Sequence, residues 1–196
     1  MHTEAYTAVM AKVKRGGRER LDGFLPSEFS GISNQERSEL VNVFTRENDF
    51  LALSAILSKA EFSEFLRNST EGLDRKSDGY VSALIWAGKV GAIENAPERL
   101  VACMPSVSTW AIGEALSYLS SIAIPNDVIK NYIVALVGVL KKKDAAPHVT
   151  LKASSELLRL KGIKPKSGEY IELSNRLQAK DRRVKDKALT ELLMRA

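Results

Sequence analysis

Residues 126–143, NDVIKNYIVALVGVLKKK, limit the possible folds more than any other stretch of this sequence. Asn126 and Asp127 suit the start of a helix, and the three closing lysines suit a helix C-terminus. Apolar side chains recur between them at helical spacing: Val128, Ile129, Tyr132, Ile133, Leu136, Val139 and Leu140. Further apolar residues fill most of the remaining circumference. A helix that is apolar nearly all round must be covered on several sides, so we expect this one in the middle of a stack.

Two alternatives compete with a buried helix here. Residues 132–137 are also typical of a buried strand, but the chain contains no second strand candidate of comparable strength to pair with it. A membrane span needs about 20 apolar residues, and Lys130 and Asn131 interrupt this segment. The helix therefore remains the preferred interpretation, and no membrane partner is expected.

The rest of the chain predicts roughly ten helices joined by short loops, with no convincing strand. Residues 49–59 are expected as one of these helices, and residues 62–66 as only a short helical turn. The glycines after Lys14 and Arg15 are expected to break the first helix. The predicted fold class is all-α.

An internal repeat indicates how these helices are arranged. Residues 149–158 (VTLKASSELL) and 184–193 (VKDKALTELL) lie 35 positions apart and are identical at six of ten positions. The repeating unit is predicted to be a helical hairpin of about 35–39 residues. A small residue, Ala153 or Ala188, lies where its first helix crosses a neighbour. The first helices are expected at 108–122, 147–160 and 181–193, and the second helices at 126–143 and 167–179.

The segment Asp-Arg-Arg-Val-Lys-x-x-Ala-Leu, residues 181–189, resembles the first helix of a HEAT unit. The resemblance to the HEAT and armadillo class is clear over residues 108–196. Residues 35–104 are predicted to form irregular helical hairpins, in which no repeating residue pattern is found. Residues 1–34 resemble a capping region. The resemblance implies one domain over 1–196, a right-handed stack of antiparallel helical hairpins (a HEAT-like α-solenoid). It is a likeness of fold and carries no catalytic residues.

Charge is distributed unevenly along the chain. Residues 141–196 contain 15 Lys and Arg against 7 Asp and Glu, a net of +8, whereas residues 35–140 have a net of −4. Turns at equivalent points of stacked repeats line up on one edge, so the basic clusters are expected to merge into one ridge that docks an acidic protein or a nucleic-acid backbone. The alternative is a solvated edge whose lysines match helix dipoles. The candidate partner-binding residues are Lys141, Lys142, Lys143, Lys164, Lys166, Lys180, Arg182, Arg183, Lys185 and Lys187.

The residues needed for catalysis are scarce. One cysteine, Cys103, lies in an apolar run, and the chain has only two histidines, His2 and His148. These cannot assemble a zinc site of ordinary spacing. The Arg-Gly-Gly-Arg segment at 15–18 lacks the flanking strand of a phosphate-binding loop. No metal, cofactor or small-molecule substrate is expected, and the chain is predicted not to be an enzyme.

One arrangement of aromatic and acidic residues has a catalytic counterpart. Trp110 and Glu114 lie four residues apart on one predicted helix, with Trp86 on a nearby hairpin. HEAT-like DNA glycosylases combine exposed tryptophans with a carboxylate on a basic concave surface, but their motif does not align with this chain residue by residue. Packing of both tryptophans in the core is the preferred interpretation.

Two classes of function follow from these features. The first is a non-enzymatic protein-binding module, one form of which is a bacterial immunity or antitoxin-type protein that neutralises a toxin domain; a basic toxin would then meet the acidic face of residues 35–140. The second is a HEAT-like protein that binds DNA or RNA on the basic C-terminal ridge, with a glycosylase-like protein as a more distant alternative. The N-terminus lacks a signal-peptide pattern, so a cytoplasmic location is expected.

Overall fold

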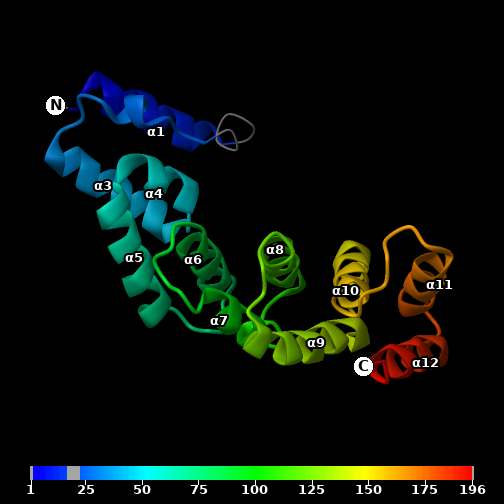
Figure 1. Ribbon diagram of the computed structural model, residues 1–196. Coiled ribbons are helices and arrows are strands. Elements are labelled where there is room, and N and C mark those ends of the chain that lie inside the picture. Colours follow the sequence, from blue (N-terminus) through cyan, green and yellow to red (C-terminus); the bar gives the residue numbers. More distant parts are fainter. Residues whose placement is uncertain (1, 17–22, 196) are drawn as a thin grey trace.

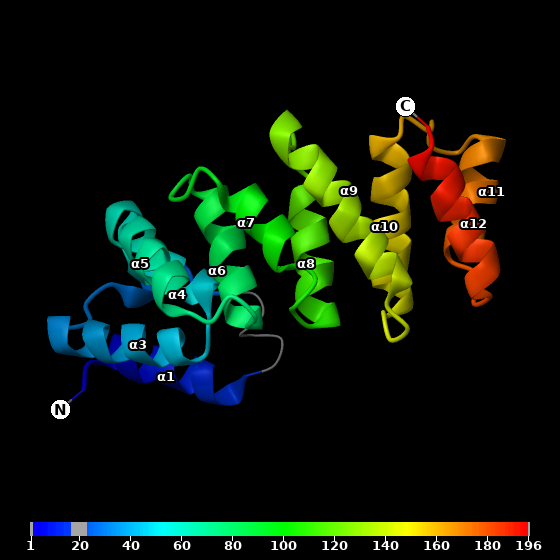
Figure 2. The same ribbon diagram turned by 90° about the horizontal axis from the view of Figure 1, so that it is seen from below.

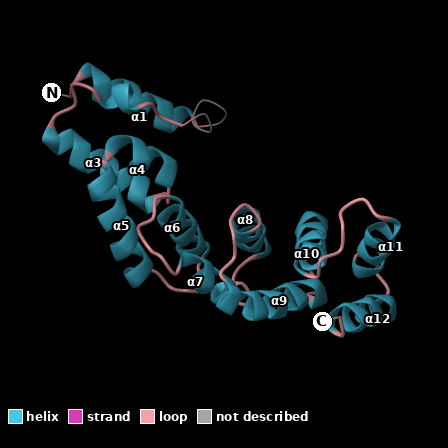
Figure 3. Ribbon diagram, viewed as in Figure 1, coloured by secondary structure: helices cyan, strands magenta, loops and turns pink. Residues whose placement is uncertain are grey.

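The computed structural model describes residues 2–16 and 23–195, and this part of the chain is entirely helical, without a strand. The break predicted at the glycines begins at Gly16, while the rest of that segment, including Gly17 and Arg18, lies outside the described residues. The helices, drawn in Figures 1 and 3, are α1 (Glu4–Arg15), the 3-10 helix η1 (Pro26–Phe29), α3 (Asn34–Arg46), α4 (Phe50–Ile56), α5 (Lys59–Gly72), α6 (Asp78–Lys89), α7 (Ala96–Cys103), α8 (Thr109–Leu119), α9 (Asn126–Lys141), α10 (Pro147–Leu160), α11 (Gly168–Leu177) and α12 (Arg182–Leu193).

Local capping explains why the helices begin where they do. A serine precedes several of them, and its hydroxyl accepts a hydrogen bond from a backbone N–H in the first turn. This arrangement is found at Ser33, Ser58, Ser77, Ser108 and Ser167. Helices α7 and α10 instead have a proline in their first turn, where its missing N–H costs no hydrogen bond. The predicted all-α class is confirmed.

Two predicted elements have different lengths in the structure. The short turn expected at 62–66 is part of α5, a helix of 14 residues that starts with a capping box between Ser58 and Glu61. That same box ends the preceding helix early, because Ser58 is extended, and α4 therefore stops at Ile56. The apolar periodicity predicted that this helix continues to residue 59, but the capping box at Ser58 ends it earlier.

The helices form a curved two-layer stack from α6 onward (Figures 1 and 2). Figure 1 places α6, α8, α10 and α11 in one row on the concave side, while α7, α9 and α12 form the outer row. Neighbouring helices pack against one another along the concave row, and α7 packs against α9 in the outer row. The expected stack of helices is thus present; its right-handed sense remains a prediction.

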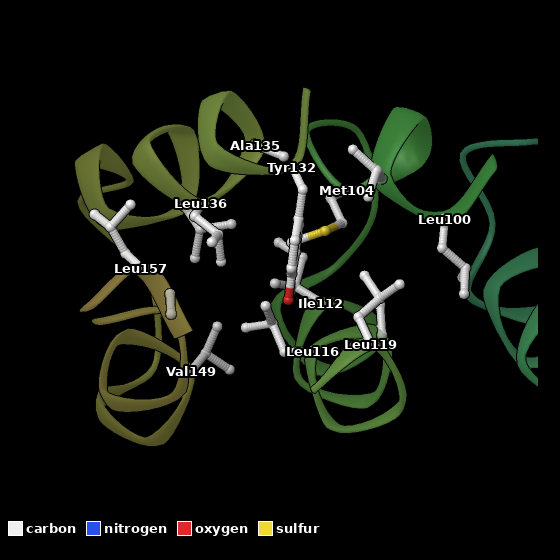
Figure 4. Packing of buried hydrophobic residues seen from close by; sticks show 14 of the residues in the cluster. Leu100, Met104, Ile112, Leu116, Leu119, Tyr132, Ala135, Leu136, Val149 and Leu157 are labelled. Carbon is white, nitrogen blue, oxygen red and sulfur yellow. The ribbon is translucent and has the colours of Figure 1, made fainter. Parts of the chain in front are cut away.

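The buried core consists of two clusters that meet at α6. Tyr80 and Leu84 of this helix belong to the cluster that continues to α12, whereas Ala83 and Ala87 face the cluster of α1 to α5. Figure 4 shows the larger cluster, with Tyr132 directed from α9 toward the helices of the concave row. One helix with apolar residues on both faces therefore joins the two cores.

Helix α9 is not covered on all sides, contrary to the expectation from its sequence. Its buried face carries Tyr132, Leu136 and Leu140, but Val134 is 66% exposed and the neighbouring Gly138 is also exposed. The helix lies in the outer row, where solvent reaches the convex side (Figure 1). None of the helices within 2–16 and 23–195 has the length and apolar character required to cross a membrane.

The predicted alternation of first and second helices is wrong at the C-terminal end. Helix α11 lies beside α10 in the concave row, and α12, whose sequence repeats that of α10, lies in the outer row with α9 (Figure 1). The two repeat segments therefore occupy different layers. Ala153 and Ala188 are nevertheless both fully buried, as their expected role at helix crossings requires.

Candidate functional site: a basic groove between α9 and α12

A hollow lies where the outer row is interrupted, between the end of α9 and the start of α12. Its volume is about 610 Å³. The end of α9 and the start of α10 form one side, and the α11–α12 turn with the first turns of α12 forms the other. Six cationic side chains line this basic groove: Lys141, Lys142, Lys143, Lys180, Arg182 and Lys185.

The groove follows from the change of layer after α10. Because α11 stays beside α10 (Figure 1), the next outer helix is α12, and the groove lies between its first turns and the end of α9. The Lys185 ammonium of α12 crosses the groove and donates to the carbonyl oxygen of Leu140 over 3.1 Å. That carbonyl belongs to the last turn of α9, where a cation is favourable.

The ends of α9 and α11 and the starts of α10 and α12 meet at the groove. The dipoles of α9, α10 and α12 determine the electrostatic potential there. The last turn of α9 is a negative dipole end, and Lys141 and Lys185 compensate it. Helices α10 and α12 present N-terminal turns, whose free N–H groups favour anions. The capping position of α10, Ala146, has no side-chain acceptor for these groups, whereas Asp181 accepts from the Arg183 N–H at 2.8 Å.

Most of the groove cations are unpaired. Arg182 lies 3.7 Å from Asp186, but both side chains are largely exposed, so this pair contributes little. Lys141, Lys142, Lys143 and Lys180 have no ion-pair partner within the described residues. The walls also include the apolar side chains of Leu140, Ala145, Pro147 and Ala179. The groove can therefore bind an anion that also has aliphatic surface.

The remaining predicted basic residues lie elsewhere, so the expectation of one continuous ridge is wrong. Lys164 and Lys166 lie in the turn between α10 and α11, close to Lys161, whose ammonium donates to the Arg195 carbonyl oxygen at 2.7 Å. This end of α12 is about 18 Å from the groove end, given 1.5 Å per residue over its 12 residues. Arg183 and Lys187 are exposed on α12 but do not line the groove.

The two tryptophans differ in environment. Trp86 is half-buried and packs edge-on against Phe62, with ring centroids 5.9 Å apart, as the sequence suggested. Trp110 is 59% exposed on the first turn of α8, so the prediction that it packs in the core is wrong. The buried face of α8 is formed by Ala111, Ile112 and Ala115, and Trp110 points away from it.

The described residues outside the groove provide neither a reactive thiol nor a metal site. Cys103 is buried, and burial raises the pKa of its thiol to about 11, well above the range of a nucleophilic thiolate. No group of three His, Cys, Asp or Glu side chains in the described residues is placed to hold a metal ion. The arrangement that the structure does provide is a groove lined by cationic side chains.

Sequence reasoning located the cations of the groove but missed its neutral walls. Pro147, Thr150 and Gln178 also line the groove, and they carry no charge pattern that marks them as a site. Their only signal is their position at predicted helix ends. No family model, no curated protein and no solved structure matches this chain, so the site is interpreted from its chemistry alone.

Proposed function

We propose that this chain is a non-enzymatic binding module that takes an acidic segment of a partner protein in the basic groove. The observation that carries the proposal is the convergence of six cations from two separate sequence clusters on one hollow of about 610 Å³. A hollow of this size suits a short stretch of peptide rather than a whole domain face.

The lining of the groove favours acidic side chains over other anions. Lysines supply most of the charge, and an ammonium is a flexible point charge without the planar fork that suits bidentate recognition. The apolar walls at Leu140, Pro147 and Ala179 can contact the methylene groups of Glu and the aliphatic parts of a peptide. Cations without partners in the free protein gain the most from a bound carboxylate.

The particular form we propose is a cytoplasmic immunity or antitoxin-type protein, which neutralises a toxin domain by covering part of it. An inhibitor of this kind needs a specific surface and no catalytic group. The groove at residues 141–185 would bind an acidic segment of the toxin, and the acidic region of 35–140 is available to basic parts of the same partner.

A second candidate is a nucleic acid whose phosphates enter the same groove. The N-terminal turns of α10 and α12 favour it, because free N–H groups at helix starts are suited to phosphate. Against it, the side chains lining the groove include no aromatic residue on which bases stack. We therefore rank it below the acidic peptide.

Fluorescence anisotropy tests the proposal with a labelled Asp/Glu-rich peptide and labelled single-stranded and duplex DNA and RNA, at low and raised salt. The variant Lys141→Glu/Lys142→Glu/Lys180→Glu reverses three groove charges. The matched control Lys164→Glu/Lys166→Glu/Lys187→Glu reverses the same number outside the groove.

We expect the peptide to bind at low salt, the groove variant to lose at least about tenfold in affinity, which is about 1.4 kcal/mol, and the control to retain it. Equal losses in both variants, or no peptide binding, would overturn the proposal. Stronger binding of a nucleic acid than of the peptide, with the same dependence on the groove charges, would establish the second candidate instead.

A further inference from the structure

An exposed tryptophan with an unpaired carboxylate lies outside the groove, on α8. Trp110 is 59% exposed, and Glu114, four residues later, is exposed on the same face of the helix. Side chains at this spacing are neighbours, with Cβ atoms about 6 Å apart. Within the described residues Glu114 has neither an ion-pair nor a hydrogen-bond partner.

A lysine of α10 reaches this part of α8 but does not pair with Glu114. Lys152 extends from α10, and its ammonium donates to the carbonyl oxygen of Gly113 and to the Ser117 hydroxyl. It holds the two helices together one turn beyond Trp110 and makes no ion pair with Glu114. The carboxylate therefore stays free to accept hydrogen bonds from outside the chain.

A second carboxylate lies at the N-terminal cap of α8. Asp78, at the start of α6, accepts hydrogen bonds from the Ser108 hydroxyl at 2.7 Å and the Ser108 N–H at 3.3 Å. Ser108 caps α8 two residues before Trp110. The first turns of α8 therefore carry two negative groups, Asp78 at the cap and Glu114, in contrast to the basic groove.

We infer that Trp110 and Glu114 form a second contact site, which takes an arginine side chain of the protein partner. A guanidinium can lie flat on the exposed indole face while its N–H groups donate to the Glu114 carboxylate. Indole is the most favourable ring for a cation, and arginine stacks on it more readily than lysine does. An aliphatic side chain would leave the carboxylate without a partner.

The same geometry disfavours a nucleic acid at this position. A strand whose base stacked on Trp110 would bring its phosphates near Glu114 and Asp78, and like charges repel. An arginine instead neutralises the unpaired carboxylate. Charge complementarity therefore selects a cationic side chain.

The Trp110 site and the basic groove adjoin the same turn of α10. Pro147 lines the groove, and the next residue, His148, lies against Gly113 of α8, one turn from Trp110. One extended segment can therefore reach both, with acidic residues in the groove and an arginine a few residues away. Assigning the arginine to the same partner rests on the proposed function; the cation site itself does not.

Matched peptides test the inference. The labelled acidic peptide is extended through a short Gly/Ser spacer by two arginines, or in the control by two glutamines. The protein carries Trp86→Phe, so that tryptophan emission reports on Trp110 alone, and circular dichroism checks that this variant stays folded.

We expect the arginine peptide to bind about fivefold more tightly than the glutamine peptide, since a cation–π contact at an exposed site is worth about 1 kcal/mol, and to change Trp110 emission. Trp110→Leu and Glu114→Gln should each abolish the preference. Glu94→Gln, which removes another exposed carboxylate, should retain it.

The outcomes separate this site from the proposed function. Equal binding of both peptides overturns the arginine site and leaves the groove proposal standing. An arginine-rich peptide that alters Trp110 emission while no acidic peptide binds supports the site and overturns the groove. If single-stranded DNA alters Trp110 emission and Glu114→Gln strengthens that binding, a nucleic acid occupies the site and the inference fails.

Discussion

The Lys185 side chain of α12 donates a hydrogen bond to the Leu140 carbonyl oxygen in the last turn of α9, over 3.1 Å. This contact joins two outer helices across the basic groove. It also means that Lys185 serves a structural role, unlike Lys141 and Lys180, which have no ion-pair partner among the described residues. The predicted partner-binding residues therefore divide into a lysine that shapes the groove and lysines free to bind.

Replacing Lys185 by methionine keeps the aliphatic stem and removes the donor. We expect the free energy of unfolding to fall by about 1 kcal/mol, since a half-buried hydrogen bond to a charged group is lost. Urea denaturation followed by circular dichroism measures this. Lys187→Met on the same helix, where the side chain is exposed, should change stability little; an equal loss in both variants would show that the Leu140 contact does not stabilise the fold.

Ala153→Leu and Ala188→Leu should each destabilise the protein by about 1–3 kcal/mol, because a larger side chain must be accommodated in a filled core. Both alanines are fully buried. Thermal unfolding measures the effect, with the exposed helical residue Ala102 as control. Unchanged melting temperatures for the first two variants would contradict close helix packing at these positions.

The helical elements could be predicted because their signals are local. Serine caps and apolar periodicity act within a few residues, and they located most of the helices correctly. The layer that each helix occupies depends on interactions between distant segments. The similarity of residues 149–158 and 184–193 predicted equivalent positions for α10 and α12, yet α12 lies in the outer row.

The difference between local signals and long-range packing also explains how much of the groove could be predicted. Lys141 and Lys180 were identified from charge alone, but their convergence depends on the placement of α12, which no local pattern encodes. Lys164 is equally basic and lies at the other end of the α12 hairpin. Trp110 was assigned to the core because tryptophan is usually buried, and its exposure follows from the orientation of α8.

Acid should weaken the attachment of the N-terminal segment through Glu36. The residue is 5% exposed, and its carboxylate accepts hydrogen bonds from the N–H and hydroxyl groups of Ser33 and Thr3. The hydrogen bonds from Ser33 and Thr3 outweigh the opposing effect of burial and lower the Glu36 pKa to about 2, from 4.5. Because the folded-state pKa is depressed, this stabilisation is present above about pH 4.5 and is lost as the pH falls toward 2.

The measurement compares melting temperatures of the wild type and Glu36→Gln across this pH range. Glu61 titrates in the same window, with its pKa also lowered to about 2 by the hydrogen bonds from Arg37 and Ser58, so the wild type alone is not diagnostic. We expect Glu36→Gln to melt lower at neutral pH and the difference to shrink as the pH falls. A difference that is independent of pH would show that the Glu36 charge does not stabilise the fold.

Tyr132 should tolerate loss of its hydroxyl but not of its ring. The side chain is fully buried between α9 and the concave row, and its hydroxyl oxygen has no hydrogen-bond partner in the described structure (Figure 4). Burial, reinforced by the nearby Glu156 carboxylate, raises the pKa of this hydroxyl, so it stays neutral.

Tyr132→Phe removes an unsatisfied polar group and should change the free energy of unfolding by less than about 1 kcal/mol, or increase it. Tyr132→Ala leaves a cavity at the centre of the larger core and should cost about 3–5 kcal/mol. Urea denaturation of the two variants measures both values, and a large loss in Tyr132→Phe would mean that the hydroxyl makes a stabilising hydrogen bond in solution.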